Sequence, residues 1–384
     1  MNAQELVAPV AEDIRAMADD VERERQLPEK LRRRLTDAGL FSIYTPTRFG
    51  GMELPLPEAL AVVEEAARHD GSTGWTIALG VANDLFTSIL PDETAARVLG
   101  HGSTLIASAP GFGVRAERVA GGYRLSGQWS FCSGAPNADW MNVAAPVFEG
   151  GEPCLGPAGP EMIMAFMPPS DVTIVDTWYV TGLRGSGTQD LRVDDLFVPE
   201  AMTGRFGLPG GPAPVRPSTI ARFPFFTIIA LIQAPPVCLG VARHALEAFR
   251  ELALEKERPF TGRLSEQVQA QVGLARAEAL VRSARAYWYG EVQAAWDRVA
   301  CGNELSLADR AGLRIASLTA AEQSTAAVDL LYRLAGSTAI FQASPLERCW
   351  RDVHTAAQHM QVQDCRWETA GRVLFGLEPG SPIV

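Results

Sequence analysis

The feature that most constrains the fold is a change of hydrophobic periodicity along the chain, from helical to strand-like and back again. Residues 1–103 repeat their apolar side chains at the helical spacing, which predicts an all-α domain. Over residues 104–215 glycine, proline and asparagine interrupt the chain and the period falls towards two, which predicts a β domain. Residues 216–384 return to helical spacing. The sequence therefore predicts an α+β protein of three domains, which suits a length of 384 residues.

Proline and glycine residues set the expected elements of the first two domains. Helices are expected to open at Pro28, Pro57 and Pro91, because proline is favoured in the first helical turn. The segment Arg118–Leu125 is typical of a hairpin that turns on two glycines. Further strands are expected over residues 162–167, 172–175 and 191–198, and a linker over residues 207–217.

The last domain contains two long helical repeats. In the first, Ser265 is a candidate N-cap, and the apolar residues that follow share one helical face: Val268, Val272, Ala275 and Ala279. The second runs from Leu307 to Leu334, with Ser306 as its expected cap and Gly336 as its stop. The domain is therefore expected to consist of long packed helices.

The composition limits the classes of partner. A formal net charge of −11 disfavours binding to nucleic acid or to an anionic membrane surface. The charge-free stretch Phe223–Ala242 is long enough to span a bilayer, but Pro224 and the pair Pro235-Pro236 would break a spanning helix. We expect a buried helix there and no membrane association. Six scattered cysteines and an N-terminus without a basic and then apolar leader indicate a cytoplasmic protein with reduced thiols and no metal site.

One short motif, Gly127–Gly134, combines aromatic and hydroxyl side chains directly after the expected hairpin. The faces of Trp129 and Phe131 could stack on a flat ring system, while Ser133 could hydrogen-bond its polar edge. Taken alone, the same pattern also fits an ordinary buried strand that ends in serine. The rest of the chain has to decide between the two.

Three further segments follow in a characteristic order: Gly182–Thr188, Leu191–Pro199 and Pro345–Asp352. Together with Gly127–Gly134 and the α, β, α order, they make the chain resemble the acyl-CoA dehydrogenase superfamily over almost its whole length. The resemblance implies an N-terminal all-α domain, a central β-barrel-like domain and a C-terminal four-helix bundle. It also implies a flavin held between the last two domains, and assembly into a homo-oligomer, most often a tetramer.

Two departures from the dehydrogenase pattern indicate the branch. Dehydrogenases need a carboxylate base shortly after the Arg351-Asp352 pair, and residues 353–360 contain none; His359 lies about where the base is expected. The segment Ala109–Gly113 also lacks the dehydrogenase Thr-Glu-Pro signature. Both changes are similar to the flavin-dependent monooxygenases of two-component systems, the group D hydroxylases, which share the fold.

That resemblance implies reduced flavin (FADH2 or FMNH2) and O2 as cofactors, used through a C4a-hydroperoxyflavin that hydroxylates a phenol- or indole-type molecule. Ser133 is expected beside the flavin N5, as a catalytic residue together with His359. The other residues that the resemblance places at the flavin are Trp129, Phe131, Gly134, Ser186, Thr188, Arg258 and Phe260, the last two reaching the flavin phosphate of a neighbouring subunit. Because no strand–GxGxxG–helix unit for a nicotinamide is present, we expect a separate NAD(P)H:flavin reductase as partner.

The role expected for His359 is that of a base or hydrogen-bond partner, since an ordinary histidine pKa of about 6.5 permits both at neutral pH. His354 is a secondary candidate. It lies five residues earlier and so on another helical face, which argues against a metal pair.

Other functions remain open at this point. An acyl-CoA dehydrogenase or oxidase with a displaced base would use Glu347 or Glu368 instead of His359. An N-oxygenase of an amino sugar would share the same fold and cofactor. A protein of this fold that only binds a partner, without catalysis, is a third possibility, because a fold does not guarantee an activity.

Overall fold

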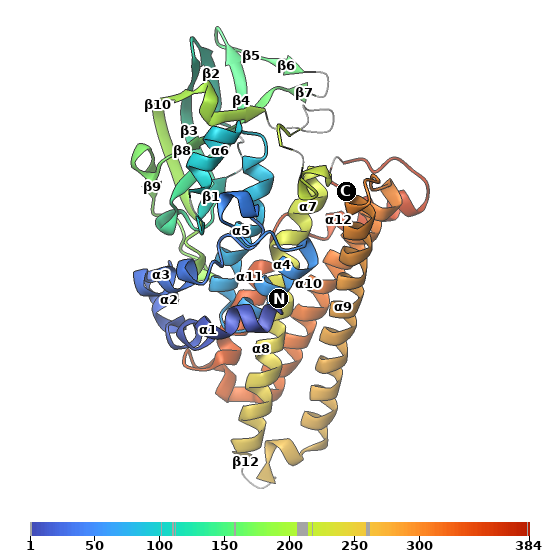
Figure 1. The fold of residues 1–384 in the computed structure, drawn as a ribbon. Helices are drawn as coiled ribbons and strands as arrows, with labels where there is room; N and C mark the ends of the chain where they lie inside the picture. Colours follow the sequence, from blue (N-terminus) through green and yellow to red (C-terminus); the bar gives the residue numbers. More distant parts are fainter. Residues whose placement is uncertain are drawn as a thin grey trace.

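The computed structural model describes residues 2–100, 102–109, 111, 113–156, 159–205, 214–216, 218–258, 262–381 and 383–384. A β domain forms one end of the molecule, a long helical bundle forms the other, and the N-terminal helices pack beside their junction (Figure 1). This confirms the expected order of helical, strand-rich and helical regions. The expected linker, residues 207–217, lies almost entirely outside the described residues.

The N-terminal region is all-helical, as predicted. Its helices are α1 (Ala3–Ala16), α2 (Ala18–Glu24), α3 (Glu29–Asp37), α4 (Leu56–Ala67), α5 (Gly71–Thr87) and α6 (Asp92–Leu99). Prolines stand at or next to the starts of α3, α4 and α6, as expected. Helix α5 has no proline at its start. Instead the Asp70 carboxylate accepts hydrogen bonds from the backbone N–H and the hydroxyl of Thr73, both at 2.7 Å, which caps the helix.

The central domain is a mixed sheet of nine strands that curves without closing. Hydrogen-bonded neighbours follow the order β11-β8-β4-β2-β3-β10-β9, with β1 and β5 paired to β4. The bounds are β1 (Ile106–Ala109), β2 (Arg115–Val119), β3 (Gly122–Cys132), β4 (Trp140–Glu149), β5 (Glu152–Pro153), β8 (Met162–Met167), β9 (Thr173–Val175), β10 (Gln189–Pro199) and β11 (Thr203–Arg205). The predicted hairpin is β2 and β3, and the three further predicted strands are β8, β9 and β10. The described strands therefore form an open, barrel-like layer.

Two small hairpins stand apart from this sheet. Strands β6 (Leu155–Gly156) and β7 (Gly159–Pro160) pair at its edge. Strands β12 (Glu257–Arg258) and β13 (Gly262–Arg263) pair at the tip of the helical bundle. Strand β12 lies at the opposite end of the molecule from β3 (Figure 1).

The C-terminal bundle is built from α8 (Ala234–Glu255), α9 (Val268–Ala300), α10 (Leu307–Ala335) and α11 (Pro345–Ala356). Helices α7 (Phe225–Ile232) and α12 (Cys365–Leu374) pack at its upper end. The expected limits of α10 are confirmed: Ser306 forms a capping box with Asp309, and Gly336 is the C-cap.

The expected face of α9 is present. Val268, Val272, Ala275 and Ala279 share it, and all four are exposed in the single chain. The buried face lies on the opposite side and consists largely of small residues, such as Gly273 and Ala277. A Cβ at Gly273 would come within 2.1 Å of Leu334 on α10, so small residues are what permit the close approach. The expected cap was wrong: Ser265 lies in the preceding 3-10 turn, and the N-cap is Gln267, whose side chain makes no capping hydrogen bond to the helix.

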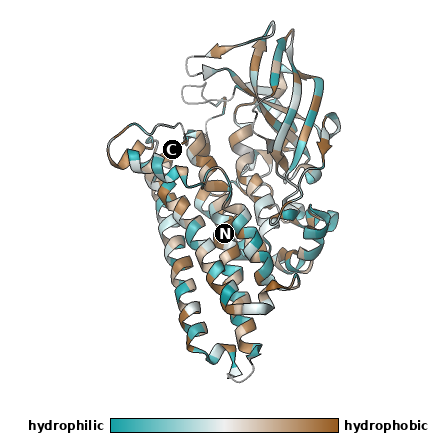
Figure 2. Ribbon diagram, turned by 180° about the vertical axis from the view of Figure 1, so that it is seen from behind, coloured by the Kyte–Doolittle hydropathy of each residue, from teal (hydrophilic) through white to brown (hydrophobic). Residues whose placement is uncertain are grey.

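The charge-free stretch behaves as a core helix. The stretch Phe225–Glu255 is long and apolar enough to be tested as a membrane span, but 78% of its most apolar window is buried in the protein. Figure 2 shows the surrounding helices with hydrophobic and hydrophilic residues side by side, as expected for helices with one packed face. The packing of α4 and α5 against α8 covers this stretch.

Candidate active site

A β-bulge at the end of β3 separates the side chains of the motif Gly127–Gly134. The register between β3 and β10 shifts between Trp129 and Cys132, and Phe131 adopts a positive φ of 64°. The Trp129 side chain lies on the buried face of the sheet, where it is 1% exposed and donates its indole N–H to the Ala144 carbonyl at 2.8 Å. Phe131 is turned outward and is 67% exposed, with its ring edge against Trp178. The expected aromatic pair is therefore split: Trp129 supports the sheet, and only Phe131 offers an open ring face.

Beyond the bulge, Ser133 joins a chain of buried hydroxyl groups. The Ser133 Oγ lies 2.9 Å from the Thr188 hydroxyl, which lies 2.8 Å from the Ser186 hydroxyl. The Ser186 hydroxyl donates to the Leu183 carbonyl at 2.7 Å. A backbone bond from Gly134 N–H to the Ser186 carbonyl, 2.8 Å long, ties the two loops together. The structure thus brings together four of the predicted residues: Ser133, Gly134, Ser186 and Thr188.

Trp75 on α5 connects this cluster to His359. Its indole N–H donates to the Ser133 Oγ at 3.0 Å, and its ring meets the His359 ring edge-on at a centroid distance of 5.7 Å. Trp75 is buried, with 7% of its side chain exposed. Ser133 and His359 therefore both contact one buried indole side chain.

His359 follows the C-terminus of α11, and its electrostatic environment keeps it neutral. Its Nδ1 is buried and has no hydrogen-bond partner among the described residues. Burial, and next the positive charge of Arg314, lower the pKa of His359 to about 4. The expectation of an ordinary histidine pKa was wrong for the ligand-free protein. A neutral imidazole with an unused ring nitrogen is a hydrogen-bonding group and only a weak base.

Arg314 on α10 fixes the loop that carries His359. The Arg314 guanidinium, 1% exposed, donates to the carbonyl and side-chain oxygens of Gln361 at 2.7 and 3.0 Å, and to the Phe226 carbonyl at 3.3 Å. Burial lowers the pKa of Arg314 to about 10, so it stays charged at neutral pH. The His359 loop is therefore tied both to the bundle and to α7.

The glycine-rich turn that carries Ser186 is fixed by α11. The buried Asp352 carboxylate accepts the Leu183 N–H at 2.6 Å. A Cβ at Gly182 would lie 2.1 Å from the Arg351 carbonyl oxygen, so only glycine allows the turn to approach α11 this closely. Burial, and next the charge of Asp70, raise the pKa of Asp352 to about 7. The sequence segments 182–188 and 345–352, far apart along the chain, thus form one unit.

Other candidate residues lie outside this unit. His354 binds Asp329 at 2.9 Å and stacks on Trp350, so it takes part in a surface contact of the bundle. Glu347 is held by Arg351 at 2.6 Å, and Glu368 is exposed on α12. Neither carboxylate occupies the place of a displaced base beside Ser133.

The two phosphate candidates are only partly described. The backbone of Arg258 is in β12, its side chain is not described, and Phe260 lies outside the described residues. Because β12 is at the far end of the bundle, this segment does not reach Ser133 of the same chain (Figure 1).

An aromatic cluster adjoins the His359 loop. Phe86 on α5 and Phe225 on α7 have ring centroids 6.4 Å apart, and Phe225 contacts Phe226 at 5.3 Å. The Phe226 carbonyl is the one that accepts from Arg314. These rings are suited to contact an apolar, flat molecule next to His359.

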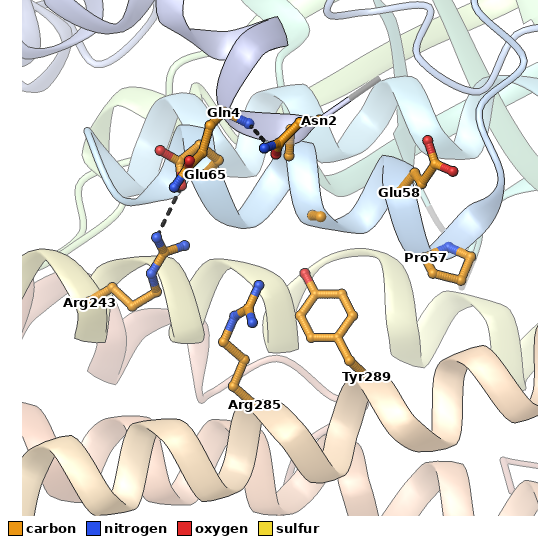
Figure 3. Close-up of a pocket in the computed structure, with 10 residues that line it drawn as sticks. Asn2, Gln4, Pro57, Glu58, Glu65, Arg243, Arg285 and Tyr289 are labelled. Carbon is orange, nitrogen blue, oxygen red and sulfur yellow. Dashed lines mark hydrogen bonds and ion pairs between the residues drawn. The ribbon is translucent and has the colours of Figure 1, made fainter.

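A separate polar hollow of about 530 Å³ lies between α1, α4, α8 and α9 (Figure 3). Glu65, Arg243, Arg285 and Tyr289 are among its lining residues, and none of the residues of the Ser133 cluster is. Beneath it the fully buried Glu64 accepts from Arg243 and Arg285, both at 2.7 Å. We interpret this hollow as the seam where the ion pairs of α4 hold the bundle.

Sequence reasoning missed part of the site. Trp75 was not predicted as a site residue, because α5 itself was not recognised. The signal was present as an Asx cap, Asp70 followed by Thr73, directly before an apolar run. Arg314 and Asp352 act through tertiary contacts that no local pattern encodes.

Comparisons with known proteins agree with this geometry. The family model "Acyl-CoA dehydrogenase, N-terminal domain" matches residues 2–92, and "Acyl-CoA dehydrogenase, C-terminal domain" matches residues 231–364. The indole-3-acetate monooxygenase of Pseudomonas putida is 31% identical over 95% of this chain and 91% of its own length. The oxygenase subunit HsaA, a flavin-dependent monooxygenase of Mycobacterium tuberculosis, is 30% identical over 97% of this chain and 95% of its own.

Solved structures have the same fold. A crystal structure of HsaA from M. tuberculosis superposes with a TM-score of 0.87 at 27% identity, covering 100% of both chains. XiaF from Streptomyces, solved in complex with FADH2 and glycerol, superposes with a TM-score of 0.89 at 24% identity over 100% of this chain and 97% of its own. The second similarity is evidence for the fold alone.

Proposed function

The chain belongs to the flavin-dependent monooxygenases of the acyl-CoA dehydrogenase superfamily, and from that premise we propose that it hydroxylates an aromatic or heteroaromatic small molecule of phenol or indole type. The observation that carries the proposal is the position of Trp75, whose side chain contacts both Ser133 and His359. The hydroxyl that we propose for the flavin and the neutral imidazole that we propose for the substrate are thus brought close together by one indole.

The residues present fit a flavin. When bound, reduced flavin supplies the electrons that activate O2 for transfer of one oxygen atom to the substrate. Ser133 retains an unused lone pair for the N5 edge of the ring system, and Gly134 allows close approach of the backbone. Thr188 and Ser186 position Ser133, and Phe131 provides the exposed ring face beside it.

His359 acts as a neutral hydrogen-bond partner. With a pKa of about 4 in the ligand-free protein, its ring is uncharged at neutral pH, and its unpartnered Nδ1 is free to bind a substrate O–H or N–H. Holding that group orients the adjacent ring carbon for oxygen transfer. The rings of Phe86, Phe225 and Phe226 supply apolar contacts and keep water from the centre.

The dehydrogenase alternative has no support from the charges around the site. Removal of an α-proton needs a carboxylate beside the flavin, and both candidates are elsewhere: Glu347 is paired with Arg351, and Glu368 is exposed. A neutral histidine with a pKa near 4 is too weak a base to replace it.

We place the protein in the cytoplasm, supplied with reduced flavin by a separate NAD(P)H:flavin reductase. The relative HsaA is named an oxygenase subunit, which supports a two-component system. We also propose a homo-oligomer, with a tetramer as the expected size. Two observations support it: the exposed apolar face of α9, and the position of β12, which contains Arg258, far from β3 of its own chain. We propose that Arg258 serves the flavin of a neighbouring chain.

The test is product formation under ¹⁸O2. The purified protein is supplied with FMN or FAD, each kept reduced by an added flavin reductase and NADH, and with a panel of indoles and phenols that includes indole-3-acetate. We expect at least one member to gain one ¹⁸O atom. If no panel member is labelled while an acyl-CoA bleaches the bound oxidised flavin without reductase, the chain is a dehydrogenase and the proposal is wrong.

A further inference from the structure

The hydrogen bonds around Ser133 have only one possible direction. The contacts are Trp75 Nε1 to Ser133 Oγ, Ser133 to Thr188, Thr188 to Ser186, and Ser186 to the Leu183 carbonyl, at 3.0, 2.9, 2.8 and 2.7 Å. These four contacts require four protons, and Trp75, Ser133, Thr188 and Ser186 carry one each. No proton is left over.

The carbonyl at the end of the chain sets the direction. Because a carbonyl oxygen can only accept, the Ser186 proton must lie towards Leu183. The Thr188 proton must then lie towards Ser186, and the Ser133 proton towards Thr188. Ser133 in turn accepts the Trp75 N–H, whose direction is fixed because an indole nitrogen can only donate.

The direction has a chemical consequence for whatever binds at Ser133. A hydroxyl has two lone pairs and one proton, and here the proton and one lone pair are already used. Ser133 therefore presents one lone pair and no proton. Thr188 and Ser186, which are 5% and 1% exposed, are used in the same way and offer no proton either.

From this geometry we propose that Thr188 and Ser186 are positioning residues that make the site selective for reduced over oxidised flavin. The inference rests on the proposed flavin site at Ser133. The N5 of reduced flavin carries a hydrogen, which the free lone pair of Ser133 accepts. The N5 of oxidised flavin carries a lone pair, which would face the Ser133 lone pair with no proton between them. A two-component oxygenase has to capture reduced flavin and release the oxidised form, so this preference suits the partner that we propose.

Substitutions at Thr188 or Ser186 can turn the Ser133 hydroxyl from an acceptor into a donor towards the flavin, while Ser133 itself is unchanged. In Ser186→Ala the Thr188 hydroxyl loses its acceptor and can donate to Ser133, which frees the Ser133 proton to point at the flavin. In Thr188→Val the Ser133 proton loses its acceptor directly. Ser133 becomes a donor in both variants, so oxidised flavin should gain affinity and reduced flavin should lose it. We call the chain of hydrogen bonds from Trp75 through Ser133, Thr188 and Ser186 to the Leu183 carbonyl the relay. Thr188→Ser keeps the relay and serves as the matched control. Ser130→Ala removes a hydroxyl of β3 that is bonded to Asp190 outside the relay.

The measurement is the ratio of dissociation constants for oxidised and dithionite-reduced flavin, determined anaerobically with FMN and with FAD by fluorescence or ultrafiltration. We expect the wild type to bind the reduced form more tightly. Ser186→Ala and Thr188→Val should lower the ratio about tenfold, which is the effect of roughly one hydrogen bond. The midpoint potential of the bound flavin should fall accordingly in both variants, because oxidised flavin gains affinity and reduced flavin loses it, and neither control should change.

The outcomes separate the two proposals. If the wild type binds neither form, the flavin site proposed at Ser133 is wrong. If it binds flavin but prefers the oxidised form, or if Ser186→Ala keeps both its melting temperature and the wild-type ratio, the relay does not set the selectivity and this inference is overturned.

Discussion

At the scale of single residues, His359 is the most informative side chain. Replacing it with Ala removes the only candidate partner for a substrate O–H or N–H described next to Trp75, so we expect hydroxylated product to fall by about 10²-fold or more, the usual loss for a positioned acid–base or hydrogen-bonding group. Flavin affinity should change little, because Ser133 and the relay stay intact. The check is product formed per reduced flavin oxidised, with peroxide measured in parallel. Unchanged turnover would show that another residue binds the substrate.

The pKa of His359 also predicts a pH dependence of stability. Its value of about 4 in the folded protein lies below the ordinary value of 6.5, so between these pH values the unfolded chain binds more protons than the folded one. The free energy of unfolding should therefore fall as the pH drops from about 6.5 to about 4. In His359→Asn this part of the slope should disappear, as measured by urea unfolding at a series of pH values. If the free energy of unfolding of His359→Asn falls with pH as steeply as that of the wild type, the low pKa of His359 is contradicted.

Some of these residues were predictable and others were not. Ser133, Ser186 and Thr188 lie in short motifs whose spacing survives in the fold, so the sequence located them. Trp129 was placed at the flavin together with Phe131 because both are aromatic residues of the motif Gly127–Gly134, and in a regular strand they would lie on the same side. The bulge at residues 130–131 breaks that alternation, and a bulge depends on pairing with β10, which a single sequence does not reveal.

At the scale of elements, the contact between α11 and the glycine-rich turn supports the relay. In Asp352→Ala the Leu183 N–H loses its buried acceptor, which should cost about 1–3 kcal/mol of stability. The displaced turn should also weaken flavin binding through Thr188. Asp352→Asn is the matched variant, because its amide oxygen can still accept from Leu183.

The Asn variant should reveal the unusual ionisation of Asp352. With a pKa of about 7 in the folded protein and 3.8 as the ordinary value, the carboxyl stabilises the fold when protonated, and this contribution is lost as the pH rises from about 4 through 7. Asp352→Asn cannot ionise, so its stability relative to the wild type should increase over that range. If the difference in unfolding free energy between Asp352→Asn and the wild type is the same at pH 5 and at pH 8, the raised pKa is refuted.

The elements show where sequence patterns are strong and where they fail. The limits of α10 could be predicted because Ser306 and Gly336 are local caps. The start of α5 was missed because its cap is an aspartate rather than a proline, and its glycines weaken the helical pattern. In α9 the spacing of Val268 and Val272 located one face of the helix, whereas the buried face that packs closely against α10 consists largely of small residues such as Gly273 and Ala277.

At the scale of the whole molecule, the exposed face of α9 predicts an assembly. Val268 is 71% and Val272 44% exposed in the single chain, on a helix 33 residues long. Burying these side chains against a second copy would remove apolar surface from water. We expect a mass of about four chains by light scattering, and Val272→Glu should lower it. Gln271→Glu, about 100° around the helix from Val272 and also exposed, is the control that should not. A monomeric wild type would contradict the proposed oligomer.

The three regions meet at one centre, since α5 contributes Trp75, the sheet contributes Ser133, and the segment after α11 contributes His359. The direct test is a crystal structure of the protein with anaerobically reduced flavin. We expect the flavin N5 at hydrogen-bond distance, about 3 Å, from the Ser133 Oγ, with the His359 ring beside the bound flavin. A flavin bound elsewhere, for example in the hollow lined by Arg243, Arg285 and Tyr289, or with its N5 turned away from Ser133, would contradict it.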